Sequence, residues 1–230
     1  MTSGLDCLHI SIDGAQAETY ERIRVHSRFE RVVNNLRLLL DTRERLGSRM
    51  PHLKLVVVIM RQNLAELPDL VRMAHDWQMV EIWVQHLCHD FGETTLPPQY
   101  QSMRAFVDSQ TLLTEDPARI ERYFAEARRD ADERGIVLRL PRTQPRPHAA
   151  SVPGWQRCDW PSRRAYISYQ GYAMPCCMVS TPDRINFGSV VEHGVAQVWA
   201  SEPYQIFRDQ LNSDQPPEIC RSCAVYNGTF

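Results

Sequence analysis

Four cysteines in the C-terminal third of the chain have a spacing typical of a metal site. Cys220 and Cys223 are separated by two residues, which lets two sulfurs from one tight turn reach the same centre. Cys158 and Cys176 lie upstream, with 17 residues between them, and must converge on that turn from elsewhere. Four thiolates suit either zinc or a 4Fe–4S cluster. The pattern therefore predicts a metal site at these four residues.

A short hairpin is expected to bring Cys176 back toward Cys158. Tyr166–Gln170 and Tyr172–Pro175 have the pattern of two strands, and Gly171 between them can adopt the backbone conformation of a tight turn. A lone cysteine is usually a small buried hydrophobe. Four cysteines that include a Cys-x-x-Cys pair favour a metal site instead.

Cys177 follows Cys176 directly and is the competing ligand. If both residues lie on a strand, their side chains point to opposite faces, so only one of them faces the centre. We expect Cys176 to be the ligand and Cys177 to pack, and the choice between the two stays open at this level.

The overall composition is that of an ordinary globular protein. A chain of 230 residues with 43% hydrophobic and 23% charged content can bury a sizeable core in one large or two modest domains. The net charge of -2 gives no reason to expect nucleic acid or an anionic membrane as a partner. The longest apolar run, Leu55–Met60, is too short to span a bilayer and suits a buried strand.

The cysteine content predicts a reducing compartment. Met1–Gly4 has no basic segment followed by an apolar stretch, so we expect no export and a cytoplasmic location. In a cytoplasm, seven cysteines serve metals or catalysis more often than disulfides. The odd number also argues against a complete set of bridges.

The N-terminal part alternates strand and helix patterns. The short joints between them imply parallel strands joined by right-handed crossovers, in an α/β fold with sites at the C-terminal ends of the strands. Asn63 is expected to cap the helix that follows it. The expected strands are Cys7–Ile12, Leu53–Met60, Val80–Leu87 and Ile136–Leu140. The expected helices are Ala17–Ile23, a helix with apolar positions from Phe29 to Leu40 that Gly47 ends, a helix after Asn63 with apolar positions from Leu67 to Ala74, and Asp116–Arg134.

A domain boundary is expected in the proline-rich stretch Pro141–Pro153, which has the composition of a semi-extended linker. Residues 1–140 precede it and form the α/β part. Residues 154–230 follow it and contain five of the seven cysteines. The sequence thus predicts two domains and a linker.

The cysteine segment resembles a known auxiliary domain. Cys158-x17-Cys176 followed by Cys220-x2-Cys223 is similar to the single-cluster "twitch" form of the SPASM domain of radical S-adenosylmethionine (radical SAM) enzymes. The full SPASM pattern continues with cysteines for a second cluster, whereas Ala224–Phe230 contains none. The resemblance therefore implies one auxiliary 4Fe–4S cluster held by these four cysteines.

The N-terminal half resembles the same family. Leu8–Gly14 and Glu18–Arg24 are similar to the fourth strand of the radical SAM barrel and its loop, and Val56–Asn63 and Val80–Leu87 look like strands five and six. The resemblance covers nearly the whole chain. It implies the C-terminal half of a partial (β/α)6 TIM-type barrel, followed by a small cysteine-rich domain.

Four residues match the family's cofactor-binding places or lie beside them. The serine of this strand and the downstream arginine commonly hold the ribose or the methionine carboxylate of S-adenosylmethionine, and Ser11 and Arg24 match them. Without the resemblance, these two would be interpreted as a capping hydroxyl and a surface arginine. Asp13, which equally suits a turn, and Gln85, near the C-terminal end of its strand, complete the expected set.

One motif of the family does not occur in the sequence. Radical SAM enzymes carry their catalytic cluster on Cys-x3-Cys-x2-Cys, whereas Cys7 and Cys88 are isolated. We therefore expect this chain to be the C-terminal portion of an enzyme, as a fragment or a split subunit, and its catalytic residues and enzyme status stay open. The alternatives are a zinc-stabilised structural or binding domain and a degenerate, non-catalytic radical SAM scaffold.

The resemblance also implies partners for the intact enzyme. They are S-adenosylmethionine, a peptide or small-molecule substrate attacked by a 5′-deoxyadenosyl radical, and an electron donor such as flavodoxin or ferredoxin. The auxiliary cluster would transfer electrons or position the substrate. A second group of possible ligands, His86, Cys88 and His89, lacks a fourth partner and is interpreted as structural.

Overall fold

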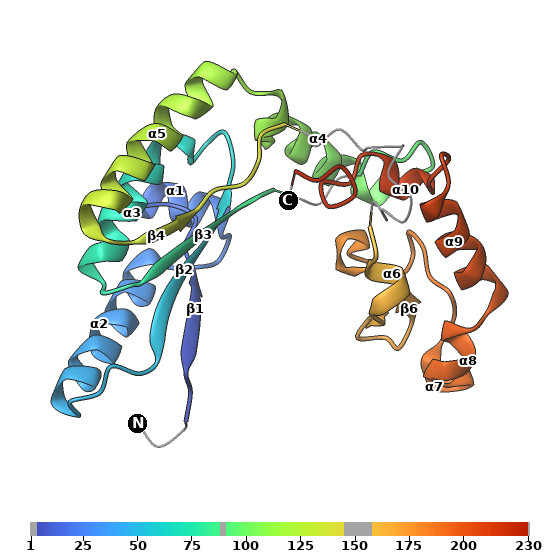
Figure 1. Cartoon of the computed structure of the whole chain (residues 1–230), viewed down its shortest axis with the longest axis horizontal. Helices are drawn as coiled ribbons and strands as arrows, with labels where there is room; N and C mark the ends of the chain where they lie inside the picture. The colour runs from blue at the N-terminus through green and yellow to red at the C-terminus, as the bar shows by residue number, and fades with distance from the viewer. Residues whose placement is uncertain (1–3, 88–90, 145–157, 230) are drawn as a thin grey trace. The chain divides into compact units, whose positions relative to one another are not determined.

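The computed structural model describes residues 4–87, 91–144 and 158–229 (Figure 1). The chain divides into two compact units. The first comprises Met1–Leu87 with Gln110–Thr143, and the second comprises Cys88–Ser109 with Gln144–Phe230. Residues 88–109 therefore belong to the cysteine-containing unit, although in the sequence they lie between the two segments of the first unit.

The first unit contains a four-stranded parallel sheet, which confirms the expected α/β class. Its order is β1-β2-β3-β4, and each neighbouring pair is parallel. Alternate residues of the central strands, such as Leu55 and Val57 on β2 and Ile82 on β3, are fully buried. The strands are β1 (Cys7–Ser11), β2 (His52–Ile59), β3 (Glu81–His86) and β4 (Val137–Arg139).

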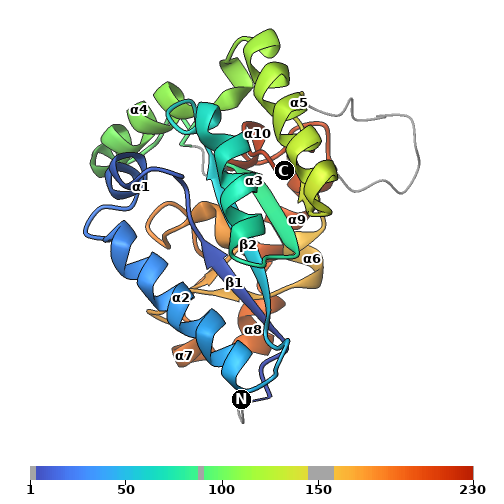
Figure 2. The ribbon, with the colours of Figure 1, turned by 90° about the vertical axis from the view of Figure 1, so that its left-hand side faces the viewer.

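The long helices of this unit cover one side of the sheet. Figures 1 and 2 show α2, α3 and α5 on the same side of the strands. Leu70 of α3 and Phe124 of α5 belong to the core that also contains Leu55 and Ile82. The helices are α1 (Ala17–Ile23), α2 (Phe29–Arg45), α3 (Leu67–Asp76) and α5 (Pro117–Arg134), with 3-10 turns η1 (Leu64–Glu66) and η3 (Leu112–Thr114).

Both ends of α5 are defined by capping residues. The Asp116 side chain accepts a hydrogen bond from the Ala118 N–H, and Pro117 takes the first helical position. Gly135 ends the helix in the left-handed conformation, with φ of 68°. The predicted helix over Asp116–Arg134 is confirmed.

Asn63 does not cap the following helix, and that expectation was wrong. Its side chain is fully buried: Oδ1 accepts a hydrogen bond from Met60 N, and Nδ2 donates to the carbonyls of Asp13 and Val58. These three bonds satisfy the amide completely except for one acceptor site. Asn63 therefore precedes η1 and its carbonyl accepts the Glu66 N–H, but its side chain joins the ends of β1 and β2 instead of capping the turn.

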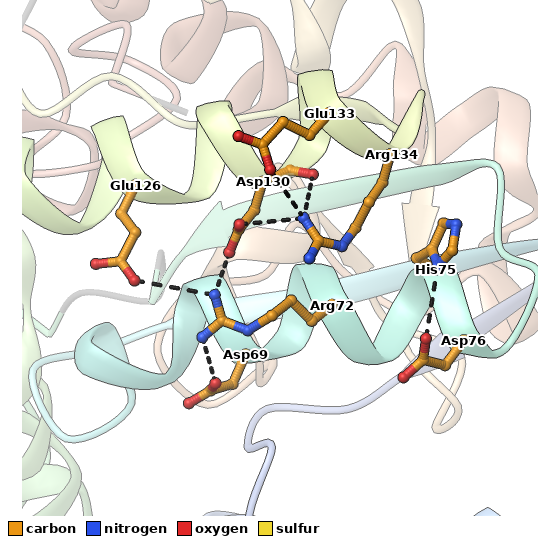
Figure 3. Close-up of polar contacts among 8 residues, drawn as sticks. All are labelled: Asp69, Arg72, His75, Asp76, Glu126, Asp130, Glu133 and Arg134. Carbon is orange, nitrogen blue, oxygen red and sulfur yellow. Dashed lines mark hydrogen bonds and ion pairs between the residues drawn. The ribbon is translucent and has the colours of Figure 1, made fainter.

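Helices α3 and α5 are connected by a charged network (Figure 3). Arg72 of α3 pairs with Asp69 on its own helix and with Asp130 on α5. Arg134 donates to the same Asp130 carboxylate at 3.1 Å. Since α3 and α5 also pack through buried apolar residues, these pairs add specificity to a contact that hydrophobic burial already stabilises.

The second unit consists mainly of short helices, with a two-stranded sheet and a small aromatic core. Phe187 stacks on Tyr204 with ring centroids 4.0 Å apart, and Phe207 and Trp199 pack edge-on against them. Its elements are η2 (Pro98–Tyr100), α4 (Gln101–Gln110), α6 (Trp160–Arg163), β5 (Tyr166–Ile167), β6 (Ala173–Met174), η4 (Cys177–Val179), α7 (Val190–His193), α8 (Val195–Trp199), α9 (Glu202–Asn212) and α10 (Glu218–Arg221).

The expected hairpin is present. Strands β5 and β6 are antiparallel, and Gly171 between them has a φ of 85°. Most of the expected linker, residues 145–153, lies outside the described residues. Across the described ranges, no helix combines the length and apolarity needed to cross a bilayer.

Candidate functional site

Three of the four predicted ligands surround one small cavity in the second unit. Cys176, Cys220 and Cys223 line it together with the apolar side chains of Val179 and Ile219. Cys176 follows the β5–β6 hairpin, Cys220 lies in α10, and the Cys223 N–H donates to the Cys220 carbonyl in the turn that follows. The hairpin and the Cys-x-x-Cys turn thus converge. The cavity is about 20 Å³, room for little more than one water molecule.

Cys158 lies beside this group. It packs against the same aromatic core as Cys220 and Cys223, and it is near enough to Cys176 for its charge to raise the pKa of Cys176 slightly. All six cysteines that the structure describes are free thiols. Within the described ranges, no three His, Cys, Asp or Glu side chains have the close grouping that holds a single metal ion.

Partial burial raises the pKa of two of these thiols, Cys158 and Cys176. It raises the pKa of Cys176 to about 11, against the smaller lowering effect of the Met178 and Val179 N–H groups. Burial also raises the pKa of Cys158 above its ordinary value. Thiolates are therefore unfavourable here without a nearby positive charge, and a bound metal supplies such a charge.

The reason for preferring Cys176 over Cys177 differs from the one expected. The strand ends at Met174, so the two cysteines are not on a strand: Cys176 is extended, and Cys177 begins the turn η4. Cys176 lines the cavity, and Cys177 is not among the lining residues.

Arg184 also lines the cavity, and the sequence analysis did not single it out. Its guanidinium forms a two-pronged ion pair with Glu93, with Nε–Oε1 and Nη2–Oε2 distances of 2.6 and 2.7 Å. The side chains are 1% and 7% exposed. The two residues are 91 positions apart, so no local pattern in the sequence indicates the pair.

The segment 91–100 makes further contacts next to the cysteines. The Thr94 N–H and hydroxyl both donate to Glu218, two residues before Cys220, at 2.7 Å. The Tyr100 hydroxyl donates to Asp183 at 2.8 Å. This segment therefore forms hydrogen bonds close to Cys220 and to the stretch that follows Cys176 and Cys177.

In the first unit, the sheet face opposite the helices carries two of the predicted cofactor residues. Ser11 pairs in register with Val56 of β2, which in turn pairs with Trp83 of β3. Gln85 lies two residues beyond Trp83 and shares its face by strand alternation. Ser11 is exposed and Gln85 is half-buried.

The other two predicted cofactor residues, Asp13 and Arg24, contact each other. The Arg24 Nε lies 2.7 Å from Asp13 Oδ2, and Asp13 is buried. Gly14 next to it is closely packed, since a Cβ there would lie 2.6 Å from Tyr20 N. Glu66 accepts hydrogen bonds from the Ala15 and Gln16 N–H groups and so holds the same loop.

His86 is a buried structural residue. Its Nε2 contacts the Arg142 carbonyl, and burial lowers its pKa from 6.5 to about 4. A neutral imidazole suits this apolar position. Cys88 and His89, the other two members of the group considered in the sequence, lie outside the described residues.

Comparison with known proteins places the cysteine region in a domain family. The SPASM family, described as an iron–sulfur cluster-binding domain, matches residues 158–224. This match includes all four predicted ligands and the cavity.

Relatives of known name match almost the whole chain. A PqqA peptide cyclase of Xanthomonas euvesicatoria pv. vesicatoria is 23% identical over 227 residues, covering 96% of this chain and 54% of the relative. The PqqA peptide cyclase of Methylobacterium nodulans is 27% identical over 225 residues, covering 96% and 52%. The chain thus spans about half the length of these relatives.

A solved structure shares the fold. The crystal structure of Streptococcus suis SuiB bound to precursor peptide SuiA superposes with a TM-score of 0.57 at 12% identity. The superposition covers 96% of this chain and 47% of that chain. At this identity the likeness concerns the fold alone.

Proposed function

We propose that this chain, a homologue of radical SAM enzymes with a C-terminal SPASM domain, binds one iron–sulfur cluster through Cys158, Cys176, Cys220 and Cys223. The observation that carries the proposal is the convergence of three of these thiols on one cavity, with Cys158 beside them, inside the region that matches the SPASM family. Four cysteine thiolates are the usual ligand set of a 4Fe–4S cluster.

The donor set fits a cluster, although the cavity must widen to hold one. The surroundings are mainly apolar apart from Arg184, and partial burial raises the pKa of Cys158 and Cys176, which disfavours bare thiolates and favours thiolates bound to iron. When bound, the cluster would supply one-electron transfer or a site for positioning a substrate. The chain's own contribution is to hold the thiols, exclude water and present Arg184 at the cavity wall.

The first unit supports a role in binding S-adenosylmethionine. We propose that it is the C-terminal half of a (β/α)6-type barrel, since its parallel strands have helices on one side and a second face that carries Ser11 and Gln85. Arg24 would bind the cofactor's carboxylate, while the ion pair between Asp13 and the Arg24 Nε fixes the position of the guanidinium. The proposed domain limits are 1–140 and 154–230, joined by the linker 141–153, with residues 88–109 assigned to the cysteine-containing unit.

The intact protein would act on a peptide. Two observations support this class: the relatives are named peptide cyclases, and the SuiB structure contains a precursor peptide. S-adenosylmethionine, held by Ser11 and Arg24, would supply 5′-deoxyadenosyl-radical chemistry on the peptide, with a flavodoxin or ferredoxin as the electron donor. The cluster in the SPASM domain would serve as the auxiliary cluster.

The metal content of the anaerobically purified and reconstituted chain tests the cluster. We expect about four irons per chain, a brown colour and a low-temperature EPR signal after reduction. The variant Cys220→Ser/Cys223→Ser should lose this iron, whereas the matched control Cys7→Ser should keep it. A colourless protein with about one zinc, or full iron retention by the double variant, would contradict the proposal.

A further inference from the structure

We propose that Arg184, held by Glu93, is the positive charge that raises the reduction potential of the cluster in the second unit. This inference rests on the proposed function, because it concerns the same site. It adds a residue that no cysteine pattern contains and assigns the buried ion pair a role other than stability.

The position of Arg184 is the first argument. Arg184 lines the same cavity as Cys176, Cys220 and Cys223, and its side chain is 1% exposed. Water therefore screens its charge poorly. A buried arginine cannot lose its proton, so this charge is permanent.

The way in which Arg184 is held is the second argument. Its Nε and Nη2 bind Glu93, its Nη1 donates to the Val179 carbonyl at 2.9 Å, and its guanidinium lies 4.6 Å from the centre of the Phe91 ring. A two-pronged carboxylate contact fixes the plane of the guanidinium. Arg184 is among the residues lining the cavity and Glu93 is not, so the arginine is the member of the pair that borders the space between the cysteines.

The direction of the effect follows from charge. Reduction adds one electron to a centre already surrounded by four thiolates, so a fixed positive charge stabilises the reduced form more than the oxidised form. Net charge and hydrogen bonds near the sulfurs are known controls of cluster potentials. Glu93 opposes part of this effect, and its removal should strengthen it.

Two substitutions with opposite predicted signs test the proposal. Glu93→Gln keeps the shape of the side chain and leaves the Arg184 charge uncompensated, so the potential should become more positive. Glu93→Gln/Arg184→Gln removes both charges without leaving either one buried alone, and the potential should become more negative. In each case we expect the ratio of reduced to oxidised cluster at a fixed potential to change about tenfold, about 59 mV for a one-electron couple.

The measurement is an EPR-monitored redox titration of the reconstituted chain with dithionite and mediators. Arg104→Gln is the control, because Arg104 belongs to the same unit but forms an exposed pair with Asp108. It should leave the potential unchanged. Arg184→Lys, which keeps the charge but loses the two-pronged contact, should shift the potential less than the double variant.

Each outcome bears on the inference. Potentials that stay constant in Glu93→Gln and in the double variant, with iron retained, would overturn it, as would shifts of the same sign in both. If the double variant does not fold, Glu93→Gln alone decides, and the absence of an upward shift overturns the proposal. Failure of the unsubstituted chain to bind iron would instead contradict the proposed function, which metal analysis detects separately.

Discussion

The carboxylate of Asp13 accepts a hydrogen bond from the Val58 N–H at 2.7 Å, although the two residues are 45 positions apart. The backbone pairing of β1 with β2 ends at Ser11 and Val56. Beyond the end of β1, the Asp13 side chain therefore continues the hydrogen bonding to β2 in place of the backbone. The same carboxylate pairs with Arg24, so one buried group fixes both the end of the strand and a predicted cofactor residue.

Asp13→Ala should destabilise the first unit by about 2–3 kcal/mol, because it leaves a buried N–H and a partly buried guanidinium without their acceptor. Asp13→Asn keeps one acceptor oxygen and should cost about 1 kcal/mol. Urea unfolding followed by circular dichroism measures both. Glu18→Ala is the control, since Glu18 is 89% exposed. Equal losses from Asp13→Ala and Glu18→Ala would contradict this role.

His86 should make the chain less stable as the pH falls from about 6.5 to about 4. The unfolded chain takes up a proton near the ordinary pKa of 6.5, whereas the folded chain resists protonation until its lowered pKa of about 4. The stabilisation present above pH 6.5 is thus lost on acidification, by at most about 3 kcal/mol.

Urea unfolding at pH 7 and pH 4.5 measures this dependence. His86→Leu should remove this part of the pH dependence, leaving only the contribution of the carboxylates. His75→Gln is the control, because the side chain of His75 is 53% exposed. An unchanged pH dependence in His86→Leu would show that burial of His86 is not its cause.

Gly171→Ala should disrupt the hairpin that carries Cys176. The added Cβ would lie 2.6 Å from Val191 Cγ2, and alanine is disfavoured at a φ of 85°. We expect a loss of about 2–3 kcal/mol and weaker iron retention. Gly194→Ala is the matched control: its φ is 78°, but the space around it is open, so about 1 kcal/mol is expected. Similar losses at both glycines would mean that the Val191 contact is unimportant.

Cys176→Ser should reduce bound iron to below about half of the unsubstituted level, because an oxygen replaces a thiolate facing the cavity. Cys177→Ser should retain nearly all of it, since Cys177 lies in the adjoining turn η4. Iron analysis after anaerobic reconstitution measures both variants. Greater iron loss from Cys177→Ser would reverse the assignment of the ligand.

Local sequence determined much of the secondary structure. The caps at Asp116 and Gly135 delimit α5, and Gly171 allows the hairpin, because each acts on the few residues beside it. A continuous apolar run rich in valine also identified β2, since such a run depends only on local composition. The spacing of Cys220 and Cys223 placed two thiols in one turn for the same local reason.

Only the tertiary structure decided which polar residues meet. Asparagine is a common helix-capping residue, but the buried Asn63 amide instead donates hydrogen bonds to carbonyls at the ends of β1 and β2. Glu93 and Arg184 have no local signal at all, because their partners come from segments 91 positions apart. A buried charge requires a partner, and which partner it finds depends on how distant segments pack, information that the spacing of residues along the chain does not contain.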